Sequence, residues 1–189
     1  IYEYFINGSW PGMHRLVPSY IADSIKYLYK NGIELYQTQA GDEFAINGIN
    51  YYIAGKLLWD TSLDENKILD DFYQKAFGRS AGAVKRFHGR LQQAWTAATA
   101  GGDDVSCKSI SDTRLLELFT PELLEQCRQD LSDAEKLAES DLVRKRVEFY
   151  RQGLHYTELT VSAVIAARKV EALGLKLFPL DKAKKDIAA

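Results

Sequence analysis

The fold is decided at the start of the chain by the stretch Ile1-Tyr2-Glu3-Tyr4-Phe5-Ile6, which predicts a strand. A second predicted strand is Ile33-Glu34-Leu35-Tyr36-Gln37-Thr38. The segment between them has apolar side chains at helical spacing, with Ser19 as the expected cap and Gly32 as the stop. A strand, a helix and a second strand make one right-handed βαβ unit with parallel strands.

Two parallel strands do not make a complete sheet, because parallel sheets need neighbours on each side and cover on both faces. The first strand begins at residue 1 without an initiator Met, a leader or a preceding polar segment. We therefore expect the chain to be cut from a larger protein. Residues 1–47 would be the end of a barrel or of a doubly wound sheet whose earlier strands are absent.

From residue 48 onward the apolar side chains recur with a period of 3.6 residues, which predicts about six helices. The longest periodic segment, from about 141 to 173, would act as a spine, and Gly153 inside it predicts a kink or a close helix contact. The predicted fold is thus mainly α, with a terminal βαβ unit (1–47) and a helical C-terminal domain (48–189). Predicted helix caps are Asp64, Ser80, Asp112 and Thr120, and predicted stops are Gly78 and Gly101-Gly102.

Composition excludes several classes of function. The formal net charge of -2 and the scattered Lys and Arg residues give no electrostatic case for nucleic acid as a partner. No apolar run approaches the roughly 20 residues that span a bilayer. Cys107 and Cys127 are too few for a disulfide framework and lack metal-ligand spacing with His14, His88 or His155. We expect unpaired thiols, no metal site and no cofactor.

A family resemblance is carried by Ile49-Asn50-Tyr51-Tyr52-Ile53-Ala54-Gly55-Lys56-Leu57-Leu58-Trp59-Asp60. Further matching positions are Asp64, Leu69, Asp71-Phe72-Tyr73, Phe77-Gly78, Tyr2-Glu3-Tyr4, Gly32-Ile33 and residues 146–156. Together they resemble a bacterial family catalogued as domain of unknown function 4838. The resemblance implies a barrel similar to those of α-glucuronidases and related glycoside hydrolases, followed by a helical domain. It also implies a secreted or periplasmic bacterial protein, but no catalytic residue can be carried over from it.

Two carboxylates are candidates for chemistry. Barrel strands alternate inward and outward, and the predicted alternation turns Glu3 and Glu34 toward the barrel lumen. Glycoside hydrolysis needs an acid and a nucleophile or base about 5 to 9.5 Å apart. Neighbouring strands lie about 4.8 Å apart, so such a pair is possible. The alternative is that one Glu is tied to an Arg or Lys of the missing barrel, or lies at its rim.

Candidate ligand-binding residues follow the two strands, at the edge where α/β folds bind ligands. Trp10 would stack on a sugar ring or plug the barrel mouth. His14 would hydrogen-bond a substrate, or be structural. The amide and carboxylate side chains of Gln37, Gln39 and Asp42 would bind sugar hydroxyls, or cap the loop.

The sequence leaves three interpretations of function. In the first, the chain is the C-terminal part of a glycoside-hydrolase-like protein that acts on a glycan or glycoside, and the helical domain supports the barrel. The chain alone would then be inactive, because catalysis needs a complete pocket. In the second, the helical domain is a non-catalytic binding or dimerisation module with an exposed apolar stripe on the long helix. In the third, it only buttresses the barrel. Trp59 and Trp95 occupy apolar helical positions and are expected to pack in the core. The sequence does not give the oligomeric state.

Overall fold

The computed structural model describes residues 1–5, 12–40, 44–99 and 114–174. In these residues the fold is mainly helical, with two parallel strands near the N-terminus, which confirms the predicted fold class. The N-terminal elements are β1 (Tyr2–Tyr4), α1 (Pro18–Lys30) and β2 (Gln37–Gln39). They are followed by α2 (Gly48–Trp59), α3 (Glu65–Phe77), the short 3₁₀ turn η1 (Gly78–Ser80), α4 (Ala81–Thr99), α5 (Arg114–Leu118), α6 (Pro121–Lys136) and α7 (Asp141–Ala172).

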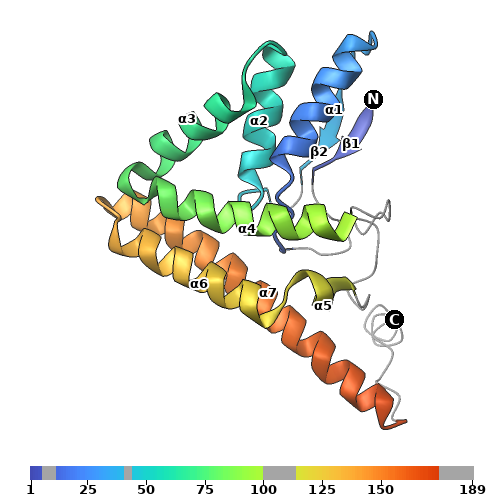
Figure 1. The fold of residues 1–189 in the computed structure, drawn as a ribbon, viewed down its shortest axis with the longest axis vertical. Coiled ribbons are helices and arrows are strands. Elements are labelled where there is room, and N and C mark those ends of the chain that lie inside the picture. Colours follow the sequence, from blue (N-terminus) through green and yellow to red (C-terminus); the bar gives the residue numbers. More distant parts are fainter. Residues whose placement is uncertain (6–11, 41–43, 100–113, 175–189) are drawn as a thin grey trace, which may run out of the picture.

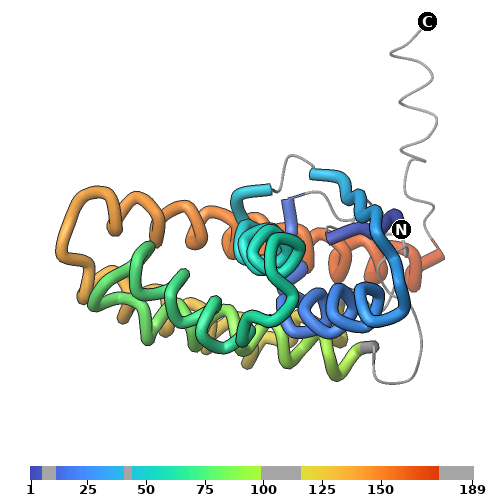
Figure 2. Tube along the Cα trace, turned by 90° about the horizontal axis from the view of Figure 1, so that it is seen from above, coloured from blue at the N-terminus to red at the C-terminus, as the bar shows by residue number. Residues whose placement is uncertain are grey.

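The helices form a layer beneath the βαβ unit. Figure 1 shows α4 crossing below α1, α2 and the strands, with α6 and α7 beneath α4. Figure 2, seen from above, shows α7 crossing the width of the molecule on the side opposite α4. The long helix thus serves as the predicted spine, and α6 packs along it.

The two strands are parallel, as predicted, with Glu3 opposite Thr38. The second strand begins at Gln37 and not at the predicted Ile33. The reason is the register: Tyr2 pairs with Gln37, so residues 33–36 precede the paired region. In the described residues these two strands pair only with each other.

The predicted alternation of the strands is reversed. Phe5 is 1% exposed and packs in a cluster with residues of α1 and α2, whereas Tyr2 and Tyr4 are 42% and 53% exposed. On β2, Thr38 is half-buried and its neighbours on either side are exposed. Glu3, Phe5 and Thr38 therefore face the helices, and Tyr2 and Tyr4 lie on the other face of the sheet.

Helix α1 begins at Pro18, one residue before Ser19, which was the predicted cap. Val17 is the capping residue and Pro18 occupies the first turn, where its missing N–H is not needed. The predicted cap Ser19 instead accepts a hydrogen bond from Gln92 Nε2 of α4 at 2.9 Å. The predicted stop is confirmed, because Gly32 follows the helix with φ of 80°.

Two of the predicted caps of the later helices, Asp64 and Thr120, are confirmed. Asp64 accepts a hydrogen bond from the Lys67 N–H at 3.0 Å, and Thr120 accepts one from Leu123. The prediction for Ser80 is wrong: this residue ends η1, and its hydroxyl donates to the Ala134 carbonyl of α6 at 2.6 Å. Helix α3 stops at Gly78 as predicted. The expected cap Asp112 and stop Gly101-Gly102 lie outside the described residues.

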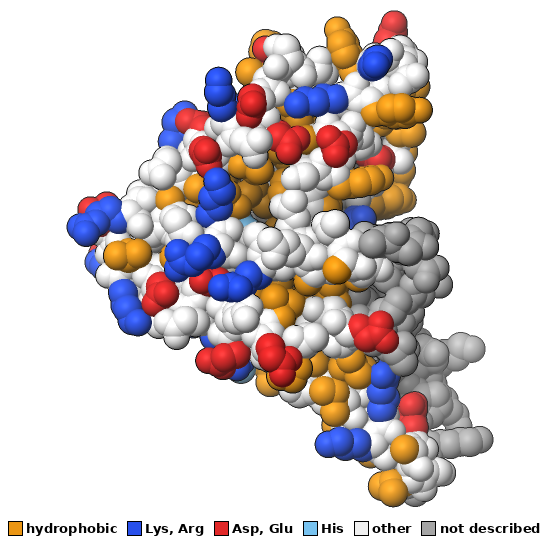
Figure 3. Space-filling model, in the orientation of Figure 1, with side chains coloured by type: hydrophobic (Ala, Val, Ile, Leu, Met, Phe, Trp, Pro, Cys, Tyr) orange, Lys and Arg blue, Asp and Glu red, His pale blue; other side chains and the backbone are white. Residues whose placement is uncertain are grey.

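Two clusters of buried side chains hold the molecule together. The larger joins α4, α6 and α7 around Phe87, Leu91 and Leu154. The smaller joins Phe5, directly after β1, with α1 and α2 around Ile21 and Ile53, so α2 packs directly on the βαβ unit. On the face shown in Figure 3, charged side chains gather over α3, α4 and α6, while hydrophobic ones gather at the α1 side.

The two tryptophans of the described helices differ in burial. Trp95 is 2% exposed and lies in the larger cluster, which confirms its predicted core position. Trp59 is 92% exposed, so its predicted core position is wrong. Residues that share a helix face are three or four positions apart, and Trp59 is only two positions after the buried Leu57.

Candidate functional site

The carboxylate of Glu3 lies between the sheet and α1. One oxygen accepts a hydrogen bond from Ser24 Oγ at 2.9 Å, and the other accepts one from the Tyr36 hydroxyl. Burial, and then the hydrogen bond to Glu3, raises the pKa of Tyr36. The phenol therefore stays protonated and is the donor in its hydrogen bond to the carboxylate. Hydroxyl groups of the βαβ unit itself thus hold Glu3.

The second predicted catalytic carboxylate, Glu34, is exposed and lies outside β2. Because Glu3 is opposite Thr38, Glu34 lies four positions before the residue that Glu3 pairs with, ahead of the start of β2. The structure does not bring the two carboxylates together.

The exposed face of the sheet brings together two of the predicted ligand-binding residues. Gln37 and Gln39 alternate with the half-buried Thr38, so both lie on the face away from the helices. Tyr2 is opposite Gln37 and Tyr4 is opposite Gln39, and the two tyrosine rings are 5.0 Å apart, edge to face. We call these four residues the open sheet face. Their rings and amides are of the kind that bind sugars by stacking and by hydrogen bonds to hydroxyls.

His14 does not lie at this face. It is fully buried against the Phe87 ring of α4, with ring centroids 5.3 Å apart, and neither of its nitrogens has a hydrogen-bond partner among the described residues. Burial lowers the pKa of His14 to about 3, so the imidazole is neutral at physiological pH. This burial agrees with the structural alternative for His14.

Two asparagines that the sequence analysis did not single out fix the chain that leaves β1. Asn50 Nδ2 donates to the carbonyls of Phe5 at 3.0 Å and Arg15 at 2.7 Å, while its Oδ1 accepts from the Val17 N–H. Asn47 Oδ1 accepts from the Arg15 N–H at 2.8 Å. Both side chains are fully buried. The sequence signal was available: polar residues three apart among the apolar positions of a helix usually have a partner.

The loops that follow both strands end on the same part of α7. After β1, a Cβ placed on Gly12 would lie 3.0 Å from the Tyr156 ring. A Cβ on Gly153 would lie 2.9 Å from His14 Cε1 and 3.1 Å from Ile46 Cδ1, and Ile46 follows β2. Gly153 therefore permits a close contact, as predicted, although the partner is a pair of loops and not a helix. The helical part lies at the C-terminal ends of the strands.

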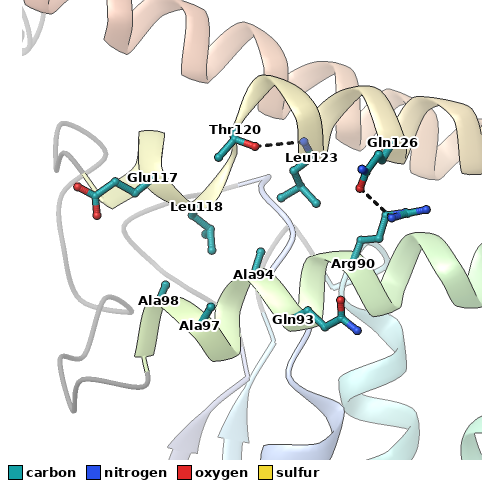
Figure 4. A pocket seen from close by; sticks show the side chains of 10 residues that line it. All are labelled: Arg90, Gln93, Ala94, Ala97, Ala98, Glu117, Leu118, Thr120, Leu123 and Gln126. Carbon is teal, nitrogen blue, oxygen red and sulfur yellow. Dashed lines mark hydrogen bonds between the residues drawn. The ribbon is translucent and has the colours of Figure 1, made fainter.

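A groove of about 540 Å³ lies elsewhere, between α4, α5 and α6. Figure 4 shows the small side chains of Ala94, Ala97 and Ala98 facing Leu118 and Leu123 across it. At one end Arg90 Nη1 donates to Gln126 Oε1 at 2.7 Å. None of the predicted site residues that the structure describes lines this groove.

Trp10 and Asp42, the remaining predicted ligand-binding residues, lie outside the described residues, as does Cys107. Cys127 is a free thiol, as predicted, and burial raises its pKa to about 12. No group of three or more His, Cys, Asp or Glu side chains in the described part of the chain is placed to hold a metal ion. No described helix is both long and apolar enough to cross a membrane.

The fold and these contacts define a mainly helical protein built onto a parallel βαβ unit. Residues 1–88 match the family model described as Domain of unknown function (DUF4838). This match confirms the family resemblance over the βαβ unit, α2, α3 and the first part of α4, and residues 146–156 lie beyond it. Searches of curated proteins and of solved structures gave no match.

Proposed function

We propose that this chain is the C-terminal part of a carbohydrate-active, glycoside-hydrolase-like protein whose (β/α)8 barrel is supported by the helical domain. The strands support this, since β1 and β2 pair only with each other in the described residues and each keeps one free edge. Parallel strands are normally found in larger sheets with both faces covered. Further strands of the same protein would pair with these edges and complete the barrel.

The open sheet face is the observation that carries the proposal. The helices α1 and α2 cover one face of the strands, and the opposite face would line the barrel interior. Tyr2, Tyr4, Gln37 and Gln39 on that face combine aromatic rings with neutral hydrogen-bonding groups. Such a lining suits a sugar ring, which offers both an apolar surface and hydroxyl groups.

Neither Glu3 nor Glu34 is suited to act as the catalytic pair of the completed barrel. Glu3 faces the helices and not the open sheet face, and Glu34 precedes β2. We therefore expect the acid and the base on other strands of the barrel. Replacement of each glutamate by Gln in the full-length protein, assayed on a panel of aryl glycosides and oligosaccharides, tests this. Turnover should be unchanged in both variants, whereas loss of an acid or a nucleophile would lower kcat by at least about 100-fold and would contradict this expectation.

We also propose that the chain of 189 residues is inactive by itself. The same glycoside panel, applied to this chain and to the full-length protein, should give turnover only with the full-length protein. Turnover by the short chain would contradict the need for a complete barrel.

A second candidate function is a helical binding or dimerisation module. The observation that favours it is a row of exposed side chains on α7, in which Leu142, Phe149 and Tyr156 are 57%, 42% and 43% exposed. Light scattering of the chain tests self-association, and a glycan array tests sugar binding. A monomer that binds no glycan would leave the helical domain with the supporting role alone.

A further inference from the structure

One face of α7 carries exposed aromatic rings. Phe149 and Tyr156 are seven residues apart, which places them on the same face of the helix, about 10 Å from each other along its axis. The buried side of α7 is different and packs on α4 and α6 through Tyr150, Leu154 and Val161. The helix thus has a core side and an aromatic side.

The aromatic side of α7 adjoins the C-terminal ends of both strands. The Tyr156 ring packs over Gly12, in the loop that follows β1, and one turn earlier Gly153 meets Ile46, which follows β2. Figure 2 shows α7 passing below the strands and the start of α2. In parallel α/β folds this edge of the strands is where ligands bind.

A second aromatic pair lies at the end of β2. The rings of Phe44 and Tyr51 are 4.7 Å apart, and the Tyr51 hydroxyl donates to the Gln39 carbonyl at 2.7 Å. Phe44 is 48% exposed. Phe44 and Tyr51 thus lie beside the end of β2, while Tyr156 lies over the loop that follows β1.

We infer that the helical domain contributes directly to ligand binding, with Tyr156 and Phe149 of α7 forming one wall of a carbohydrate site at the C-terminal edge of the strands. This inference rests on the proposed function. The chemistry favours a carbohydrate, because exposed rings stack on the apolar face of a sugar and the neighbouring Gln39 amide can bond its hydroxyls. The helical domain is then a part of the binding site as well as a support.

The test compares Tyr156→Ala and Phe149→Ala with Leu142→Ala in the full-length protein. Leu142 is an exposed residue of the same row but lies 14 positions before Tyr156, about 21 Å away along α7. Affinity for cello-, xylo- and manno-oligosaccharides is measured by calorimetry, and KM and kcat are measured on the best of them. Loss of either ring should raise Kd and KM about fivefold to tenfold, with kcat changed by less than about twofold. Leu142→Ala should bind like the parent.

The Tyr156→Phe variant separates binding from folding. It keeps the ring over Gly12, so it should retain the parent's melting temperature and most of its affinity for the sugar. If the ring acts only in packing, every variant that stays folded should have the Kd of the parent. Equal affinity of the Tyr156→Ala, Phe149→Ala and Leu142→Ala variants would overturn the inference and leave the proposed function standing. If the unaltered full-length protein binds and hydrolyses none of these sugars, the proposed function itself fails.

Discussion

His14 and His88 are both buried as neutral imidazoles where α4 meets α7. Burial lowers the pKa of each to about 3, and for His88 the neighbouring His14 lowers it further. Only one of their four ring nitrogens is paired among the described residues: Nδ1 of His88 is 3.1 Å from the Tyr73 hydroxyl. An unfolded histidine titrates near 6.5, so between pH 6.5 and 3 the unfolded chain binds protons that the folded chain excludes.

The buried histidines predict acid sensitivity. Their contribution to stability is complete above pH 6.5 and is lost as the pH falls toward 3, at about 2 to 3 kcal/mol per histidine by pH 4.5. Urea unfolding of His14→Leu at pH 7 and pH 4.5 checks this. The variant should lose about 2 kcal/mol less than the parent over this interval. His155→Gln, at an exposed position, is the control and should behave like the parent.

Gly153 predicts an unusual response to a helix-stabilising substitution. Alanine normally stabilises a helix by about 1 kcal/mol relative to glycine. At Gly153 the added Cβ would lie 2.9 Å from His14 Cε1, so Gly153→Ala should destabilise the chain by about 1 to 3 kcal/mol. The matched control is Gly89→Ala in α4, where nothing lies within 4 Å and a gain is expected. Thermal unfolding that shows a gain at both positions would contradict the close contact.

The residues of the candidate site were only partly predictable from the sequence. Gln37 and Gln39 were identified because polar side chains at the end of a strand suit ligand binding. Tyr2 and Tyr4 were missed because both faces of the first strand mix aromatic and aliphatic residues, so alternation alone does not tell which face the helices cover. The packing of Phe5 in the small cluster decides it, and that contact joins residues far apart in the chain.

At the scale of elements, α4 and α6 are joined by a buried carboxylate. Asp130 is 3% exposed and accepts hydrogen bonds from Arg86 Nε at 2.9 Å and Arg90 Nε at 2.6 Å. Both arginines reach solvent, with side chains 52% and 35% exposed, so their charges remain partly hydrated. The carboxylate depends on them because it is almost completely removed from water.

The ion pairs of Asp130 predict the cost of neutralising it. Asp130→Asn should lower the free energy of unfolding by about 2 kcal/mol, since the amide cannot accept from both guanidinium groups as the carboxylate does. Asp133→Asn, three residues away and 36% exposed, should cost less than about 0.5 kcal/mol. Urea titration of the two variants compares them directly. Equal, small losses would show that α4 and α6 are held by apolar packing alone.

Helix positions followed from the sequence better than strand limits did. Asp64 and Thr120 were found because a cap acts within one turn, which makes it a local signal. Ser80 and Ser19 have the same side-chain chemistry but bond to other helices, which a local pattern does not reveal. The start of β2 depends on its register with β1, which is likewise a contact between distant residues.

At the scale of the whole molecule, the helical part lies where the strands end. Loops from both strands contact α7 near Gly153, and the Trp95 Nε1 of α4 donates to the His14 carbonyl at 3.0 Å. A ligand bound at that edge would lie close to these helices. We therefore expect removal of the helical domain to abolish sugar binding as well as to weaken the barrel.

We expect a completed barrel to bind a carbohydrate between the open sheet face and α7. A crystal structure of the full-length protein with its best-bound oligosaccharide tests this most directly. It should show further parallel strands on a free edge of β1 or β2, and a sugar ring in contact with Tyr156. A structure in which no strand joins β1 or β2, or in which the sugar lies away from their C-terminal ends, would contradict it.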